Sequence, residues 1–207
     1  KDSTGLSLKI LENTTAARSA TVTLTSLDKT ASATFTIQQS GKVTLYNTSF
    51  STGAERNEWT LIDKDGDGQK WTFGNFGGTL GIAVFSESYG ILTGTEDTYT
   101  PENYLVSPAI SVPANATSIT ISWYAMAYYA PPYDQEKHKL IISETPITPD
   151  NCSGISPAKV FAAPANDIES VDLTGYAGKT IYIAIAHYDC TNMGAIIIDD
   201  FSVVANL

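Results

Sequence analysis

Alternation of apolar and polar residues dominates this chain, and no stretch of ten or more residues carries a helical period. Residues 20–26 and 32–38 alternate threonine with apolar side chains, which predicts two half-buried strands joined by a turn. Residues 5–11 predict one more strand. After residue 42 we expect ten short strands separated by turns rich in Gly, Pro, Asn and Asp, near residues 43–47, 59–63, 69–73, 81–86, 103–107, 117–127, 137–143, 168–173, 179–187 and 195–204. Many short strands of this kind predict an all-β, two-sheet sandwich.

Composition agrees with one sandwich of ordinary size, or with a sandwich and a small appendage. The chain has 207 residues, of which 43% are apolar and only 16% charged. No apolar run reaches the roughly 18 residues that a membrane span needs. We expect a secreted or cell-surface protein whose signal or anchor lies upstream of this sequence.

The charge is distributed unevenly and predicts two units. Residues 1–42 carry five Lys/Arg and three Asp/Glu, a net charge of +2, whereas residues 43–207 carry seven and nineteen, a net charge of −12. Residues 38–41, Gln-Gln-Ser-Gly, interrupt the strand pattern at this boundary. Lys42 is expected to link the units. An acidic surface argues against a nucleic-acid partner, which needs clustered Lys and Arg. It is suited to calcium or a basic protein, or serves only solubility.

Five motifs follow one another through residues 43–207. They are W-T-L-I-D-K-D-G-D-G-Q-K-W at 59–71, S-E-S-Y at 86–89, P-E-N-Y-L-V-S-P at 101–108, Y-A-G-K-T-I-Y-I-A-I-A-H-Y-D-C-T at 176–191 and I-D-D-F-S-V at 198–203. In this order they resemble the cleaved-adhesin domain family, the haemagglutinin/adhesin modules of the gingipain polyproteins. The resemblance implies a non-catalytic jelly-roll β-sandwich with structural calcium, which binds host or matrix proteins or carbohydrate at a bacterial cell surface. Ser51 follows Phe50 where the family often has a Glu near a calcium site.

Residues 1–42 resemble the second half of a BACON-type domain, a small β-sandwich found beside carbohydrate-active and surface modules. The matching features are Asn13, Arg18, the alternating strands and the closing I-Q-Q-S-G at 37–41. The resemblance implies a truncated small sandwich, and therefore a monomer cut from a larger multidomain protein.

Three alternating carboxylates form the sharpest local signal for a metal. Asp63, Asp65 and Asp67 stand among glycines that let the chain curl, so several oxygens can point at one hard cation. The twelfth position is Gly74 rather than the Glu of an EF-hand, so we expect a looser calcium loop. The alternative is a solvated hairpin turn.

Further carboxylates are candidate calcium ligands outside this loop. Asp199 and Asp200 end an apolar strand, and because adjacent side chains point to opposite faces, at most one of them is buried. A buried carboxylate needs a partner, either calcium or backbone amides. Glu87 is a candidate ligand from a distant loop.

Aromatic residues are densest between positions 123 and 133. Trp123 is expected in the core, whereas Tyr128, Tyr129 and Tyr133 lie in a proline-rich segment and are the candidate ligand-binding residues. Exposed rings on a stiff loop can stack on sugars or be buried by a protein. The alternative is that they cover the end of the sandwich.

Histidines and cysteines carry no recognisable metal or catalytic motif. Glu136 and His138 are expected on one strand face but lack further zinc ligands, and His187 is expected to be structural. Whether Cys152 and Cys190 form a disulfide stays open.

Three functions occur on β-sandwiches of this kind. The first is an adhesin-type module that binds a host or matrix protein, and the alternative is a carbohydrate-binding module of a glycan-utilisation surface protein. A glycoside hydrolase needs two carboxylates facing a cleft, and no strand carries such a set. We therefore predict a binding module without catalytic residues.

Overall fold

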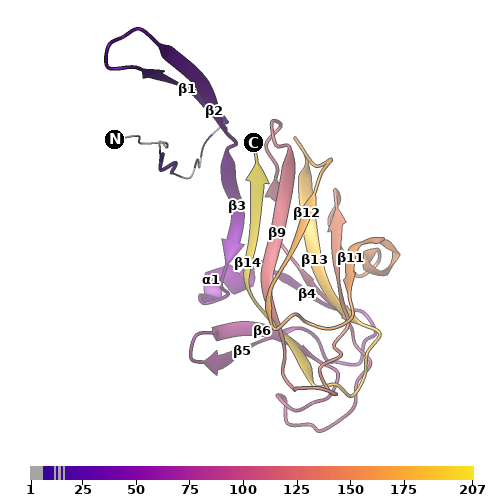
Figure 1. Cartoon of the computed structure of the whole chain (residues 1–207). Helices are drawn as coiled ribbons and strands as arrows, with labels where there is room; N and C mark the ends of the chain where they lie inside the picture. Colours follow the sequence, from indigo (N-terminus) through magenta and orange to yellow (C-terminus); the bar gives the residue numbers. More distant parts are fainter. Residues whose placement is uncertain (1–6, 12, 14, 16) are drawn as a thin grey trace.

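The computed structural model describes residues 7–11, 13, 15 and 17–207 (Figure 1). Two antiparallel six-stranded sheets pack face to face and form a β-sandwich. The first sheet has the order β12-β9-β14-β6-β5, with β3 paired to β14; its strands are β3 (Lys42–Thr48), β5 (Thr72–Gly77), β6 (Gly81–Glu87), β9 (Ser118–Ala127), β12 (Asp167–Leu173) and β14 (Ala195–Asn206). The second has the order β11-β10-β13-β7-β4, with β8 paired to β13; its strands are β4 (Thr60–Asp63), β7 (Glu102–Val106), β8 (Ile110–Ser111), β10 (His138–Ser143), β11 (Pro157–Phe161) and β13 (Thr180–Tyr188). The predicted all-β sandwich is confirmed.

The main core cluster takes buried apolar side chains from strands of both sheets. In β9, buried residues alternate with partly exposed ones along all ten positions. Trp71, Trp123, Phe50 and Phe201 are the largest aromatic side chains of the main core cluster that are almost completely buried. Trp123 is therefore in the core, as expected.

The last strand, β14, is central to the first sheet. β9 pairs along one of its edges, while the opposite edge pairs first with β6, through Ala195–Ile198, and then with β3, through Phe201–Asn206. The change of partner falls at an irregularity where Asp200 has a φ of +47°. The continuously apolar run at 195–198 is buried on both faces, which confirms it as a central strand.

A separate hairpin precedes the sandwich. β1 (Arg18–Thr25) and β2 (Ser32–Gln39) form a two-stranded sheet that pairs with no other described strand. Its expected turn is closed by a hydrogen bond from the Ser26 amide to the Ala31 carbonyl. The likeness of residues 1–42 to part of a BACON-type domain stays a prediction.

Some element boundaries differ from those expected. Residues 7–11 form no strand, because they pair with no neighbour, and residues 5–6 of that prediction lie outside the described residues. The strand expected at 69–73 begins at Thr72, since the preceding residues complete the acidic loop. Lys42, expected to link two units, is the first residue of β3 and pairs with Asn206.

Short elements between the strands carry no periodic signal. The helix α1 (Gly53–Asn57) begins with a capping box in which Thr52 and Glu55 bond each other's backbone amides. Cys152–Gly154 forms one turn of 3₁₀-helix, and the edge strand β11 is exposed along almost its full length. An exposed strand shows no alternation, so the apolar pattern could not reveal it.

Within the described part of the chain, no helix is long and apolar enough to cross a membrane.

Two fully buried tryptophans give a matched test of the core. The Trp71 indole N–H donates to the Asn103 carbonyl oxygen at 3.1 Å, whereas the Trp123 indole N–H has no partner among the described residues. We expect Trp71→Phe to lower the free energy of unfolding by about 1 kcal/mol more than Trp123→Phe, because only the first loses a hydrogen bond. Urea unfolding of both variants measures the difference. Equal losses of unfolding free energy in the two variants would show that the Trp71 hydrogen bond does not contribute to stability.

Candidate functional site

A pocket lined by three tyrosines opens between loops of the sandwich. Its volume is about 350 Å³, and its lining residues are Tyr89, Tyr129, Tyr133, Asn192 and Gly194. Tyr129 and Tyr133 are 36% and 52% exposed, so both rings present free surface to a ligand. The sequence predicted these two tyrosines but missed the other three residues, which come from two different connections.

The proline-rich segment after β9 positions the two predicted tyrosines. The Tyr128 amide donates to the Ala195 carbonyl and continues the pairing of β9 with β14 for one more residue. The Tyr133 amide donates to the Ala130 carbonyl, which closes a turn. Tyr128, the third predicted binding residue, does not line the pocket. Its ring packs edge-on against the Tyr129 ring, with centroids 5.1 Å apart, and this contact helps to hold the Tyr129 ring in place.

Gly194 forms the floor under the Tyr129 ring. Its φ is +111°, and a Cβ atom there would lie 2.6 Å from the Tyr129 ring, so no other residue fits without moving the tyrosine. The Gly194 carbonyl accepts hydrogen bonds from the amides of Ser88 and Tyr89. This contact joins the segment after β6 to the segment before β14, and thereby places Tyr89 across the pocket from Tyr129.

The acidic loop brings its three predicted carboxylates together. Ligand oxygens of Asp63, Asp65 and Asp67 all lie within 4.8 Å of one another. Asp63 accepts hydrogen bonds from the amides of Gly66 and Gly68, at 2.7 and 3.0 Å, which curls the loop around this side chain. Burial, a hydrogen bond with Asp63 and the neighbouring negative charges raise the pKa of Asp65 to about 6. A set of carboxylate oxygens that repel one another suits a hard cation such as Ca²⁺.

The other candidate calcium ligands lie outside this loop. Asp199 is buried and Asp200 exposed, so one of the pair faces inward, as strand geometry predicts. Burial is the main cause that raises the pKa of Asp199 to about 6, and the charges of Asp200 and Glu55 add to it. Glu55 in turn accepts a hydrogen bond from the Ser51 hydroxyl at 3.2 Å, at the position where the family resemblance expected a Glu.

Glu87 is also buried, at the end of β6. Its Oε1 accepts hydrogen bonds from the amides of Leu92 and Thr93, while Oε2 has no partner among the described residues. Ala195 pairs with Glu87, which places Asp199 four residues further along β14. In the described residues, no group of three close ligand atoms includes Glu87, Asp199 or Asp200.

The side chains of the two residues considered for zinc have different partners, although His138 Nδ1 lies 3.3 Å from the Glu136 backbone carbonyl oxygen. His138 forms an ion pair with Glu169, at 2.6 Å, and stacks on Phe161. Glu136 precedes β10 and points instead to His187, with 2.9 Å between Oε2 and Nε2. The expectation that His187 is purely structural therefore missed its buried acidic partner.

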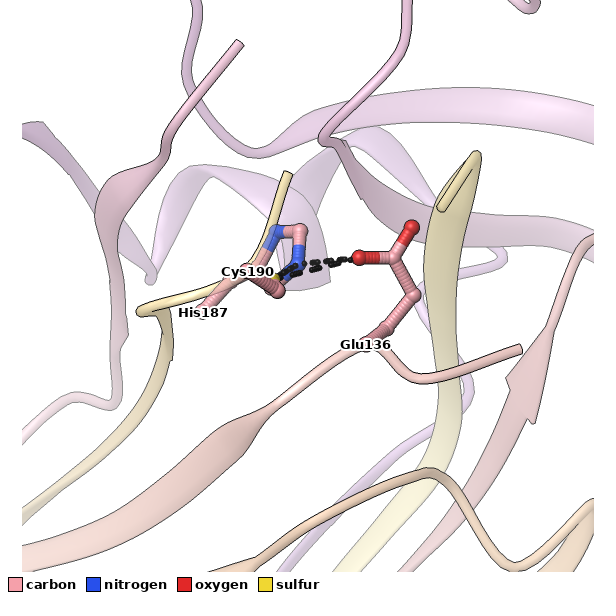
Figure 2. A group of neighbouring side chains, drawn as sticks. All are labelled: Glu136, His187 and Cys190. Atoms are coloured by element: carbon pink, nitrogen blue, oxygen red, sulfur yellow. Dashed lines mark hydrogen bonds and ion pairs between the residues drawn. The ribbon is translucent and has the colours of Figure 1, made fainter. Parts of the chain in front are cut away.

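Both cysteines are free, so the question of a disulfide is answered in the negative. Cys152 is buried in a second core cluster, and its thiol faces the Pro149 carbonyl at 3.7 Å. Cys190 lies beside Glu136 and His187 (Figure 2). The spacing of His187 and Cys190, three residues apart at a strand end, was the one sequence signal for this cluster.

Comparison with known proteins identifies the sandwich. The family model described as "Cleaved Adhesin Domain" matches residues 43–155 and 149–203. Hemagglutinin A of Porphyromonas gingivalis (strain ATCC BAA-308 / W83) is 27% identical over 179 residues, covering 76% of this chain and 8% of the relative. Gingipain R1 of Porphyromonas gingivalis (strain ATCC 33277) is 31% identical over 179 residues, covering 79% of this chain and 10% of that relative. The chain thus spans about a tenth or less of these curated relatives.

Solved structures agree with this assignment. The K3 cleaved adhesin domain of Lys-gingipain from Porphyromonas gingivalis W83 matches with a TM-score of 0.62 and 25% identity, over 79% of this chain and 99% of that one. The K1 domain of the same protein matches with a TM-score of 0.60 and 27% identity, over 76% of this chain and 96% of that one.

The floor of the tyrosine pocket can be tested by adding one methyl group. We expect Gly194→Ala to destabilise the fold by about 1–3 kcal/mol, because alanine is strained at positive φ and displaces the Tyr129 ring. Gly154→Ala is the control, since its added Cβ meets no atom within 4 Å and its φ is not positive. Thermal unfolding and NMR shifts of the Tyr129 ring measure the effect. Equal melting temperatures and equal Tyr129 ring shifts in the two variants would show that Gly194 does not position this ring.

Proposed function

This chain belongs to the cleaved adhesin domain family, and we propose that it binds a host or matrix protein through the tyrosine pocket. The domain is a non-catalytic module. The observation that carries the proposal is the pocket itself, in which Tyr129 and Tyr133 are exposed yet held in place. Tyrosine is enriched among the residues that dominate binding energy at protein interfaces, because a large rigid ring loses little entropy.

The size and charge of the surroundings support a protein ligand. A volume of about 350 Å³ is enough for one or two side chains of a partner. Residues 43–207 carry a net charge of −12, which would speed association with a basic surface. A partner with a basic surface and a protruding apolar side chain fits both features.

A carbohydrate ligand is the second candidate, and one feature of the pocket favours it. Tyrosine rings offer flat faces on which a sugar ring stacks, and Asn192 adds an amide that can hydrogen-bond hydroxyl groups. The chain would then act as a carbohydrate-binding module of a glycan-utilisation surface protein.

We further propose that the domain works as one unit of a longer secreted or surface-displayed protein. It spans only 8% and 10% of two relatives that bear the names Hemagglutinin A and Gingipain R1. Several weak binding units on one chain raise the overall avidity without new contacts, so a monomeric domain needs no tight site of its own.

Calcium is proposed to stabilise the domain at the acidic loop. Asp63, Asp65 and Asp67 supply converging oxygens, and a bound Ca²⁺ would offset the burial and the neighbouring negative charges that raise the pKa of Asp65. Asp199, Asp200 and Glu87 remain candidate ligands at other positions. Glu55 lies near enough to Asp199 for its charge to act there, so it can replace the Glu that the family has at position 51.

Red blood cells are a suitable test surface, because one relative is a hemagglutinin. We expect labelled wild-type chain to bind them, and Tyr129→Ala and Tyr133→Ala to weaken binding about tenfold or more. Ile168→Ala is the control, since this side chain on β12 is 54% exposed and lies outside the pocket.

Enzymatic treatment of the cells identifies the ligand class. Loss of binding after protease treatment indicates a protein ligand, and loss only after glycosidase treatment indicates the glycan alternative. Tyrosine variants that bind like the wild type would rule out the pocket as the contact surface.

The calcium proposal predicts opposite effects of one substitution with and without the ion. At a calcium concentration 100 times Kd, the wild-type Tm should rise by about 5 °C or more, whereas Asp65→Asn should lose most of this rise. In chelator at pH 7, Asp65→Asn should be more stable than the wild type, because the raised pKa of Asp65 means that its charge destabilises the folded state.

Asp97→Asn is the matched control for this melting experiment, since Asp97 is an exposed carboxylate in another loop. It should leave both melting temperatures within about 1 °C of the wild type. A wild-type Tm that does not respond to calcium would contradict the proposal.

A further inference from the structure

A buried carboxylate, an imidazole and a thiol meet at one point of the sandwich (Figure 2). Glu136 and His187 are completely buried. The distances are 2.9 Å between Glu136 Oε2 and His187 Nε2, 3.0 Å between Cys190 Sγ and His187 Nε2, and 3.3 Å between Cys190 Sγ and Glu136 Oε2. Three ligand atoms of different kinds therefore lie within 3.3 Å of one another, close enough to share a single ion.

Neighbouring hydroxyl groups hold two of these side chains in position. Ser86 Oγ lies 2.8 Å from His187 Nδ1, so the other ring nitrogen, Nε2, is the one turned toward the cluster. The Ser88 hydroxyl donates to Glu136 Oε1 at 2.9 Å and leaves Oε2 facing the thiol. Metal sites commonly have such second interactions, which fix the orientation of each ligand.

We propose that Glu136, His187 and Cys190 bind a divalent metal ion of borderline softness, Zn²⁺ in the first instance. Zinc is bound by cysteine, histidine and carboxylate side chains, with bond lengths of about 2.0–2.3 Å. Tetrahedral ligands at these lengths lie roughly 3.3–3.6 Å apart, so the observed triangle needs to widen by only a few tenths of an ångström. A fourth position is left for water.

Charge balance also favours binding of a divalent metal ion at this cluster. On binding, the Cys190 thiol releases its proton to solvent, and the thiolate and the Glu136 carboxylate together neutralise the two positive charges of the metal. Without a metal, burial and then the Glu136 charge raise the pKa of Cys190, so the thiol stays protonated and is no activated nucleophile. Cys190 retains some exposed surface, which offers the ion a way in.

The ligand set separates this site from the acidic loop. Calcium prefers oxygen ligands alone, whereas a thiolate and an imidazole select zinc-like ions. The two clusters share no residue. We therefore expect both ions to bind at the same time.

The metal would fasten the connections that form the tyrosine pocket. Glu136 belongs to the connection that carries Tyr129 and Tyr133, and Cys190 to the one that carries Asn192 and Gly194. Because the ion bonds both connections, it would act as a cross-link at the base of the loops.

Cobalt titration tests the site directly, because a cobalt–thiolate bond absorbs strongly in the near ultraviolet. The full chain, freed of metal and held in a thiol-free reductant with excess Ca²⁺ in the acidic loop, is titrated with Co²⁺. We expect the absorption to saturate at about one equivalent and to disappear when Zn²⁺ displaces the cobalt. Cys190→Ser should abolish the band, and Glu136→Gln should weaken cobalt binding about tenfold or more.

Cys152→Ser is the matched control, since Cys152 is the other free cysteine and belongs to a different core cluster; it should keep the band. No band in the folded wild type, or a band that persists in Cys190→Ser, would overturn the proposal. If Cys190→Ser does not fold by circular dichroism, alkylation of the wild type decides. Zn²⁺ should slow labelling of Cys190, and an unchanged rate would overturn the site.

Discussion

Packing of two six-stranded sheets against one apolar core is the constraint on which every other feature of this protein depends. β14 lies in the interior of the first sheet, because it pairs with β9 on one edge and successively with β6 and β3 on the other. A central strand buried on both faces cannot slip by one residue without exposing its apolar side chains. The loops at the strand ends are therefore anchored to a rigid frame.

The proposed binding sites lie where strands end, since the loops there are not constrained by packing in the core. The tyrosine pocket joins residues that follow β6, β9 and β13, and Gly194 links two of these connections by hydrogen bonds and by its contact with Tyr129. Glu136 and Cys190 lie on two of the same connections, and His187 lies near the end of β13. A non-catalytic domain can thus present a stiff aromatic surface without a helix or a disulfide to support it.

Sequence alone determined the fold class and placed three carboxylates in one loop, because these features depend on residues close together in the chain. Alternation of threonine with apolar side chains in residues 20–26 and 32–38 predicts two strands whatever their partner, and the continuous apolar run at 195–198 predicts a central one. The loop of Asp63, Asp65 and Asp67 was equally visible, since three carboxylates stand within five residues among glycines, and the structure places their oxygens within 4.8 Å of one another. Ordered motifs across residues 43–203 identified the family.

Only the tertiary structure decided which distant residues meet. Glu136 precedes β10 and pairs with His187, whereas His138, the first residue of β10, pairs with Glu169. Tyr89 and Gly194 are 105 residues apart, yet pairing of β6 with β14 brings them into one pocket. Strand order sets such contacts, and strand order is a property of the whole sandwich that no local pattern of residues encodes.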